Sequence, residues 1–373
     1  MAMKLRAEKE MLLEALSNAA RAAKKETGAS LHLSLSNGTL TVTGDDNEIT
    51  IECSLSVAGE GGGTALAPAR LLHDIVRSLD PGAVTLNITP GDIEVSSGRS
   101  HFHVMTPKAG RWSISERRPT ARGITLPIGP FHEGLRQVVR AASSDLGKNP
   151  QLTGVRLEGA ESGLRMVATD SYRMALRDLE GLDTAGPEGS VTIPARGLDE
   201  LRHVLEAAEK GGLQEFSFAH DDTSATFDVG ATRLSTRLLR GDYVDYRRLL
   251  PTAYPNRFAF NREELLTALR RVHLIARNGE NPHMPIHLAP RSDLLSVQAT
   301  TTQSGTAEEV VDGDLLEGEE MRLAFNCSYL IDGLDAIRSE RVVLSYITPL
   351  KPAVLRGEDD GDYSYLVMPV NVA

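Results

Sequence analysis

Few side chains in this sequence have the spacing that chemistry at a site requires. His101 and His103 alternate, as residues on one face of a strand do, and two imidazoles on one face could bind a metal ion. No third ligand lies near them in the sequence, so a pair exposed on a strand is the better interpretation. The acidic pairs Asp45-Asp46 and Asp359-Asp360 stand in turn contexts and are expected to be solvated loops.

Motifs of common active sites are missing from the sequence. It contains no G-x-S-x-G, H-E-x-x-H or Walker A string. The glycine-rich run at 59–63 lacks the spacing of a dinucleotide-binding loop and is expected to be flexible. Cys53 and Cys327 lie far apart without a CxxC motif, which argues against a disulfide scaffold and favours a reducing cytosol. We therefore predict no catalytic residue, no metal and no cofactor.

The composition is that of a globular protein with two or three domains. The chain has 373 residues, and its hydrophobic fraction of 41% is too high for disorder. It has no long apolar run, and residues 1–13 lack the apolar core of a signal peptide, so we expect a cytoplasmic protein without a membrane partner. The formal net charge of -11 argues against nucleic-acid binding, although a basic stripe can lie on an acidic body.

Alternating apolar residues predict antiparallel strands with one face on a core and one face in water. The alternating leucines of 31–35 and the apolar residues of 40–42 flank Asn37-Gly38, which is a strong hairpin signal. Similar alternation flanks Pro90-Gly91 and Asp221-Asp222. These segments favour β-hairpins over helices.

Helical patterns are fewer, and they recur. Residues 8–23, 131–142 and 262–277 each carry apolar side chains three positions apart on one face. This set of predicted helices recurs with spacings of 122 and 131 residues between matching leucines.

A second set of predicted helices recurs in the same order. Residues 68–75, 194–201 and 326–333 align with spacings of 126 and 132, and each has an acidic residue at the same position. Two matching sets predict one α+β domain copied three times, a unit too long for a solenoid repeat. Proline and glycine cluster near 122–123 and 251–255, so we predict domains at 1–122, 123–252 and 253–373.

Four strings in the predicted second and third domains resemble signatures of one family. They are Ala168–Ala175 (ATDSYRMA), Asp245–Pro251 (DYRRLLP), Phe325–Asp332 (F-N-x-x-Y-L-x-D) and Tyr365–Val370 (YLVMPV). With them the whole chain resembles the bacterial sliding clamp, the DNA polymerase III beta subunit.

The resemblance implies three tandem DNA-clamp domains in each chain and a non-catalytic processivity factor. Two chains would form a head-to-tail homodimeric ring around double-stranded DNA, with helices inside and sheets outside. The ring would tether the replicative DNA polymerase alpha subunit, the clamp loader and other proteins that carry a clamp-binding motif. A ring that encloses DNA does not have to recognise its bases, so a few basic residues on the helices would be enough to attract the phosphates.

The resemblance also implies three sets of site residues. The peptide-binding pocket would comprise Leu152, Thr169, Ser171, Tyr172, Arg173, Met174, Val244, Arg248, Leu249, Asn326, Tyr329, Leu350, Pro352, Met368, Pro369 and Val370. The DNA-facing residues would be Arg21, Lys24, Lys25, Arg77, Lys148 and Arg196. The dimer interface would bring Phe102 and Val104 of one chain to Leu274 and Ile275 of the other.

The sequence departs from the family pattern near the expected pocket. Val244 stands where proline is usual, Asn371 stands where arginine is common, and the stretch 283–287 is unusual. One hypothesis is therefore a second, specialised clamp with an altered pocket. Two further hypotheses remain, an α+β enzyme with an unrecognised site and a repeat-built scaffold that does not touch DNA.

Overall fold

The order of helices and strands repeats three times along the chain. The computed structural model describes residues 3–23, 29–107, 123–145, 147, 149–160, 163–182, 189–251, 253–279 and 284–371. Over these residues each repeat has one strand, a helix, four strands (five in the first repeat), a second helix and three strands. This order confirms the predicted α+β class and the threefold repeat.

The helices agree closely with the predicted segments. The three repeats contain α1 (Lys9–Arg21) and α2 (Ala69–Ser78), α3 (Ile128–Val138) and α4 (Ala195–Lys210), and α5 (Arg262–Ala276) and α6 (Cys327–Ala336). The last two helices begin at asparagines, Asn261 and Asn326, whose side chains accept backbone N–H groups of the first turn. The helices are amphipathic, with Leu12 and Leu16 of α1, for example, fully buried.

Two antiparallel sheets contain the first repeat and part of the second. The five-stranded sheet has the order β5 (Ala58–Glu60), β1 (Met3–Glu8), β7 (Ala83–Thr89), β8 (Asp92–Ser97) and β9 (Ser100–Met105). The eight-stranded sheet has the order β10 (Ile124–Pro127), β15 (Glu215–His220), β16 (Ser224–Val229), β17 (Thr232–Arg237), β4 (Ile49–Ser56), β3 (Thr39–Asp45), β2 (Ser30–Ser36) and β6 (Gly63–Pro68).

One antiparallel sheet contains the rest of the second repeat and the third. Its twelve strands have the order β14 (Ser190–Pro194), β11 (Gly154–Ala160), β12 (Gly163–Thr169), β13 (Arg173–Glu180), β25 (Tyr363–Val367), β24 (Ala353–Gly357), β23 (Arg341–Tyr346), β18 (Asn256–Asn261), β21 (Gly305–Glu317), β20 (Leu294–Thr301), β19 (Pro285–Pro290) and β22 (Leu323–Asn326). Residues 285–287 of the unusual stretch form the start of β19, which pairs with β20 and β22, and His283 lies outside the described residues.

Consecutive repeats share their sheets. β4 of the first repeat pairs with β17 of the second, and β13 of the second repeat pairs with β25 of the third. The chain folds into two compact units, one with most of 3–129 and 196–238, the other with most of 130–182, 189–195 and 239–371. The predicted limits at 122 and 252 stay predictions.

The predicted hairpin at Asn37-Gly38 forms because its turn residues accept a left-handed backbone. Asn37 and Gly38 have φ angles of 49° and 74°, as a type I′ turn requires, and they join β2 to β3.

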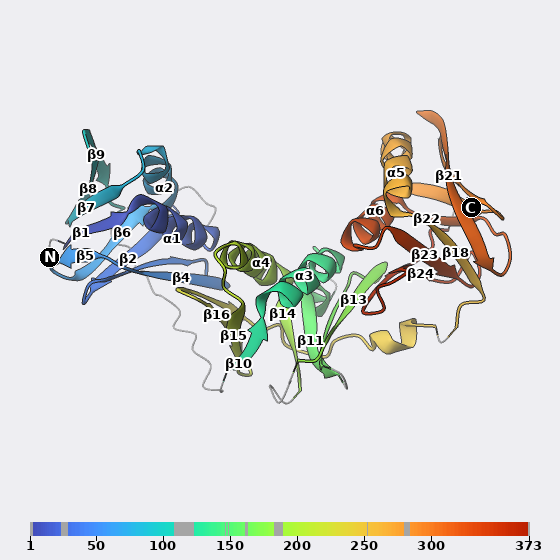
Figure 1. The fold of residues 1–373 in the computed structure, drawn as a ribbon, viewed down its shortest axis with the longest axis horizontal. Helices are drawn as coiled ribbons and strands as arrows, with labels where there is room; N and C mark the ends of the chain where they lie inside the picture. Colours follow the sequence, from blue (N-terminus) through green and yellow to red (C-terminus); the bar gives the residue numbers. More distant parts are fainter. Residues whose placement is uncertain are drawn as a thin grey trace. The chain divides into compact units, whose positions relative to one another are not determined.

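Within each unit, helices cover one face of a sheet. Figure 1 shows α1 beside α2 and α5 beside α6, and α1 packs on β3 and β4. No helix of the described residues is long and apolar enough to span a bilayer.

Gly44 allows α1 to approach the eight-stranded sheet closely. A Cβ atom at this position would lie 1.9 Å from the carbonyl oxygen of Ala19 in α1. Since both groups are backbone, Gly44→Ala is expected to lower the free energy of unfolding by about 1–3 kcal/mol in chemical denaturation. The matched control is Gly159→Ala in β11, where a Cβ would meet nothing within 4 Å. Equal stability of the two variants would contradict the close approach.

Candidate functional site

The turn between β12 and β13 is built by the side chains of the ATDSYR string. The Thr169 hydroxyl donates to the Arg173 carbonyl at 2.6 Å, and Asp170 accepts the N–H groups of Tyr172 and Arg173 at 2.9 Å each. Ser171 takes a positive φ of 77° at the tip. The turn thereby holds the Tyr172 side chain in solvent, where it is 53% exposed.

Arg173 connects this turn to α6. Its guanidinium donates to Asp170 at 3.0 Å, pairs with Asp332 on α6, and reaches the Tyr365 hydroxyl at 3.5 Å. It also lies 4.5 Å from the centroid of the Tyr329 ring. Burial alone would lower the pKa of Arg173, but Tyr365 and the carboxylates outweigh burial and raise it. Arg173 is thus a permanent cation whose partners, Asp170, Asp332 and the Tyr329 ring, all belong to the protein itself.

The C-terminal segment 368–370 runs from this turn to β22. The Met368 N–H donates to the Tyr172 carbonyl at 2.8 Å, and the Val370 N–H donates to the Ala324 carbonyl at 2.8 Å. Between them Pro369 forms a β-bridge with Phe325, the neighbour of Asn326. Predicted pocket residues of three separate strings therefore come together within one unit.

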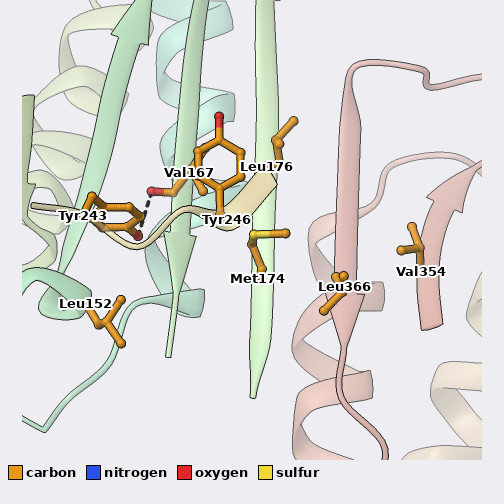
Figure 2. Close-up of a cluster of buried hydrophobic side chains, with 8 residues drawn as sticks. All are labelled: Leu152, Val167, Met174, Leu176, Tyr243, Tyr246, Val354 and Leu366. Atoms are coloured by element: carbon orange, nitrogen blue, oxygen red, sulfur yellow. Dashed lines mark hydrogen bonds between the residues drawn. The ribbon is translucent and has the colours of Figure 1, made fainter. Parts of the chain in front are cut away.

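An apolar cluster lies beside this segment and is drawn in Figure 2. Its members are buried side chains of β12, β13, β24, β25 and the segments at 152 and 243–246: Leu152, Val167, Met174, Leu176, Tyr243, Tyr246, Val354 and Leu366. Half-buried Val244 and Met368 pack against it. The Tyr243 hydroxyl donates to the Val167 carbonyl at 3.4 Å, so this phenol is satisfied inside the cluster. The eight members form a buried core, and the half-buried side chains that pack against it lie between this core and the surface.

The DYRRLLP string forms the short helix η3 (Tyr246–Leu249) at the edge of the cluster. Tyr246 is buried, whereas Leu249 is 44% exposed and Arg248 is paired with Asp245 at 2.8 Å on the surface. Glu158 of β11 holds this helix, since its carboxylate accepts the Tyr246 hydroxyl and an Arg247 N–H at 2.6 Å.

Glu158 is a buried carboxylate whose charge is compensated. Burial alone would raise its pKa, but the Tyr246 hydroxyl and the guanidinium groups of Arg156 and Arg247 outweigh burial, so the pKa is lowered. Its contribution to stability is therefore present above the unfolded pKa of a glutamate and is lost as pH falls through the lower folded value.

Glu158→Gln is accordingly expected to lower the free energy of unfolding by about 1.5–3 kcal/mol at pH 7. The deficit should shrink as the pH is lowered toward about 3, because the native protein then loses the same charge. Denaturant unfolding at both pH values tests this, with the exposed Glu180→Gln on β13 as the control. A deficit independent of pH would contradict the role of the charge.

Leu350 and Pro352 lie in the turn before β24 and take no part in these contacts. Leu350 is 76% exposed and Pro352 is half-buried. Asn371 is exposed. The predicted site residues did not include Asp170, Asp332, Tyr365 or Glu158, although the first three belong to the quoted strings. A prediction that residues of one string bind one another would have identified Asp170, which binds Tyr172 and Arg173 of its own string.

The predicted DNA-facing residues lie on or beside helices, and each one described has a carboxylate partner. Arg21, at the end of α1, pairs with Glu200 at 3.2 Å, and Arg77, on α2, pairs with Asp74 at 3.4 Å. Arg196 at the start of α4 pairs with Asp46 and, at 3.2 Å, with Glu48. Lys24, Lys25 and Lys148 lie outside the described residues. These pairs reduce the local positive potential around the three arginines.

The four predicted interface residues differ in exposure. Phe102 on β9 and Ile275 on α5 are half-buried, and Leu274 is 52% exposed. Val104 is only 1% exposed, because it faces the core of its own sheet. In the described part of the chain, no three His, Cys, Asp or Glu side chains come together as a metal site would need.

Models of the DNA polymerase III beta subunit match nearly the whole chain. The N-terminal domain model matches residues 3–112, the central domain model 125–245 and the C-terminal domain model 247–371. The beta sliding clamp of Streptomyces coelicolor is 31% identical, with 100% of both chains covered. That of Synechocystis sp. is 32% identical over 89% of this chain and 88% of its own.

A solved structure has the same fold over its whole length. The DNA polymerase sliding clamp from Bacillus subtilis superposes with a TM-score of 0.89 at 26% identity, and 100% of each chain is covered.

Proposed function

Because the chain belongs to the DNA polymerase III beta subunit family, the beta sliding clamps, we propose that two copies close head to tail into a ring around duplex DNA. The threefold order of elements carries this proposal, since two chains of three similar domains supply six units to one ring. The domains are 1–122, 123–252 and 253–373, with helices toward the hole and sheets outside. Such a ring encloses DNA without reading bases.

The DNA contacts in this proposal come from Arg21, Arg77 and Arg196 together with Lys24, Lys25 and Lys148. Their charge attracts phosphates without sequence preference. Since the three arginines already have carboxylate partners, each phosphate contact is weak and quickly exchanged. Weak contacts favour sliding over fixed binding.

The peptide site in this proposal is the predicted pocket, with the cluster in Figure 2 as its floor. Its occupants are short segments of the replicative DNA polymerase alpha subunit, the clamp loader and other proteins that carry the motif. Each buried Leu or Phe anchor contributes about 1.5–3 kcal/mol before ordering costs. Binding of that strength allows partners to exchange.

The chain acts as an accessory subunit and leaves bond formation to the polymerase. It needs no cofactor for enclosure or tethering, and we place its work in the cytoplasm with the replication machinery. The polymerase gains processivity because a tether keeps it at a high effective concentration near its primer.

A primer-extension assay tests this function. The replicative polymerase and clamp loader of the same organism extend a primed circular template in the presence of an excess trap template. We expect the chain to lengthen the products of one binding event by about 10²-fold or more. Product lengths that do not change on its addition would refute the tethering function.

A further inference from the structure

Ion pairs cross the junction between the first and the second repeat in both directions. Arg21 at the end of α1, in the first repeat, pairs with Glu200 of α4 at 3.2 Å, and Figure 1 shows these two helices next to each other. In return, Arg196 of α4 pairs with Asp46 and, at 3.2 Å, with Glu48 in the turn between β3 and β4. Carboxylates of each repeat therefore hold an arginine of the other.

The junction between the second and the third repeat has the same reciprocal arrangement. The guanidinium of Arg140, two residues after α3, lies 3.9 Å from Asp332 and 3.9 Å from Asp335, both on α6. In return, Arg338 of the third repeat pairs with Glu133 of α3. The cross-repeat pairs thus occur once in each compact unit, at the equivalent place.

One acidic partner stands at the same position of every repeat. Glu200 and Asp332 are the acids that align in the second set of helices, with a spacing of 132 residues. The matching acid of the first repeat is Asp74, which pairs with Arg70 and Arg77 of its own helix at 3.7 and 3.4 Å. This position therefore has an arginine beside it in each repeat, and at the two junctions the arginine comes from the preceding repeat.

The arginines of these pairs are more accessible than their acidic partners. The side chain of Arg21 is 37% exposed and that of Arg140 is 60% exposed, whereas Glu200 is 18% and Asp332 is 32% exposed. Ion pairs near the surface are weak, because water and salt compete for both groups. A phosphate that reaches such an arginine can consequently replace the carboxylate, which stays behind in the protein.

We propose that the junction arginines exchange between carboxylates of the neighbouring repeat and phosphates of DNA, so that DNA in the ring loosens the junctions between repeats. The inference rests on the proposed ring around DNA, and it adds Arg140 to the residues that contact DNA. Without DNA, the carboxylates occupy the places of phosphates. Because coupling between two equilibria is reciprocal, ion pairs that DNA must open weaken DNA binding by the same factor.

The shared sheets determine how far a junction can loosen. β4 pairs with β17 across the first junction, and β13 pairs with β25 across the second. The backbone hydrogen bonds of these strand pairs involve no charged group that a phosphate could exchange. When the ion pairs open, the strands therefore keep the repeats joined while the helices gain freedom to move, as at a hinge.

The first junction is the better one to test. At the second junction, Arg136 and Gln137 of α3 also donate to the Ala336 carbonyl at the end of α6, at 3.0 and 3.2 Å. Asp332 in addition binds Arg173 beside the predicted peptide pocket, so its replacement would disturb a second site. Glu200 can be replaced without either complication.

The first test is a double-mutant cycle, read as the affinity of the full-length chain for a short labelled DNA duplex at about 50 mM salt by fluorescence anisotropy. Glu200→Gln should tighten binding by about threefold to fivefold, the worth of one partly exposed ion pair. Arg21→Ala should weaken binding, and in that background Glu200→Gln should give a clearly smaller gain. Glu180→Gln on β13 is the control, because it changes the net charge equally at an exposed position of a sheet.

The second test reads the junction itself by hydrogen exchange. In rings loaded on closed circular DNA, the backbone N–H groups of the β3–β4 turn should exchange about threefold faster than in free rings, because Arg196 no longer holds Asp46 and Glu48. In the variant D46N/E48Q the turn is already released, so DNA should not change its exchange.

Two results would overturn the inference while leaving the ring around DNA intact. One is an equal gain from Glu200→Gln with and without Arg21, which would mean general charge attraction in place of exchange. The other is a β3–β4 turn that exchanges no faster on DNA. An unaltered chain that neither binds the duplex nor stays on closed circles would instead overturn the proposed function, and this inference with it.

Discussion

Replacing Arg173 by alanine is expected to abolish binding of clamp-binding peptides and to lower the free energy of unfolding by about 3–5 kcal/mol. The guanidinium is largely buried and joins Asp170 in the β12–β13 turn to Asp332 on α6. Its removal leaves these carboxylates facing each other without a cation. The turn that positions Tyr172 and the C-terminal segment then loses its anchor to Tyr329 and α6.

Fluorescence polarisation with a labelled clamp-binding peptide, at a temperature where each variant is folded, measures the first effect. Arg177→Ala is the matched control, because Arg177 lies on the same strand, is similarly buried and pairs with Asp360 at 3.0 Å. The control should lose stability and keep peptide affinity. Arg173→Lys should restore part of the stability but little binding, because an ammonium cannot span both carboxylates and stack on a ring. Unchanged peptide affinity in Arg173→Ala would place the pocket elsewhere.

Replacing Leu274 by aspartate is expected to weaken the dimer by about a thousandfold. Leu274 is 52% exposed on α5, so the isolated chain tolerates a charge there. At an interface the same charge would be buried without a partner, and it would occur twice because a ring of two chains has two equivalent interfaces.

Sedimentation equilibrium measures the constant, and thermal unfolding at low concentration verifies the fold. Met11→Asp is the control, since Met11 is 50% exposed on α1 and lies outside the predicted interface. It should leave both readouts unchanged. A Leu274→Asp variant that dimerises normally would exclude α5 from the interface.

Local patterns predicted the elements but not which strands pair across repeats. The alternation around Asn37-Gly38 defined a hairpin because turn chemistry and side-chain faces are local properties. The pairing of β4 with β17 joins residues far apart in the chain, such as Cys53 and Thr232, and both strands show the same alternation whatever their neighbours are. The sequence therefore did not predict that consecutive repeats share their sheets.

The candidate site shows the same limit. The ATDSYR and YLVMPV strings located its parts, and the structure shows that the Tyr172 carbonyl and the Met368 N–H bond them together. Glu158 was not predicted as a site residue because a single glutamate within a strand pattern is expected to face solvent. In the structure it is only 6% exposed, and its carboxylate binds Arg247 of η3. Valine is a residue type that is expected at an interface, yet the side chain of Val104 is buried in the core of its own sheet.

The structure describes both residues that depart from the family pattern near the expected pocket. Val244 packs against the apolar cluster, and Asn371 is exposed. A specialised second clamp stays a hypothesis, and membership of the sliding-clamp family does not require it. Peptide affinity equal to that of an ordinary clamp would remove the reason to consider it.

Retention on closed and on cut DNA tests the central claim most directly. The chain is loaded onto a nicked circular plasmid and separated from free protein by gel filtration, before and after a restriction enzyme linearises the DNA. Topological enclosure predicts that the protein elutes with circles, survives high salt there, and is lost once free ends appear. Equal retention on both forms, or loss from circles in high salt, would mean that ordinary charge attraction holds it.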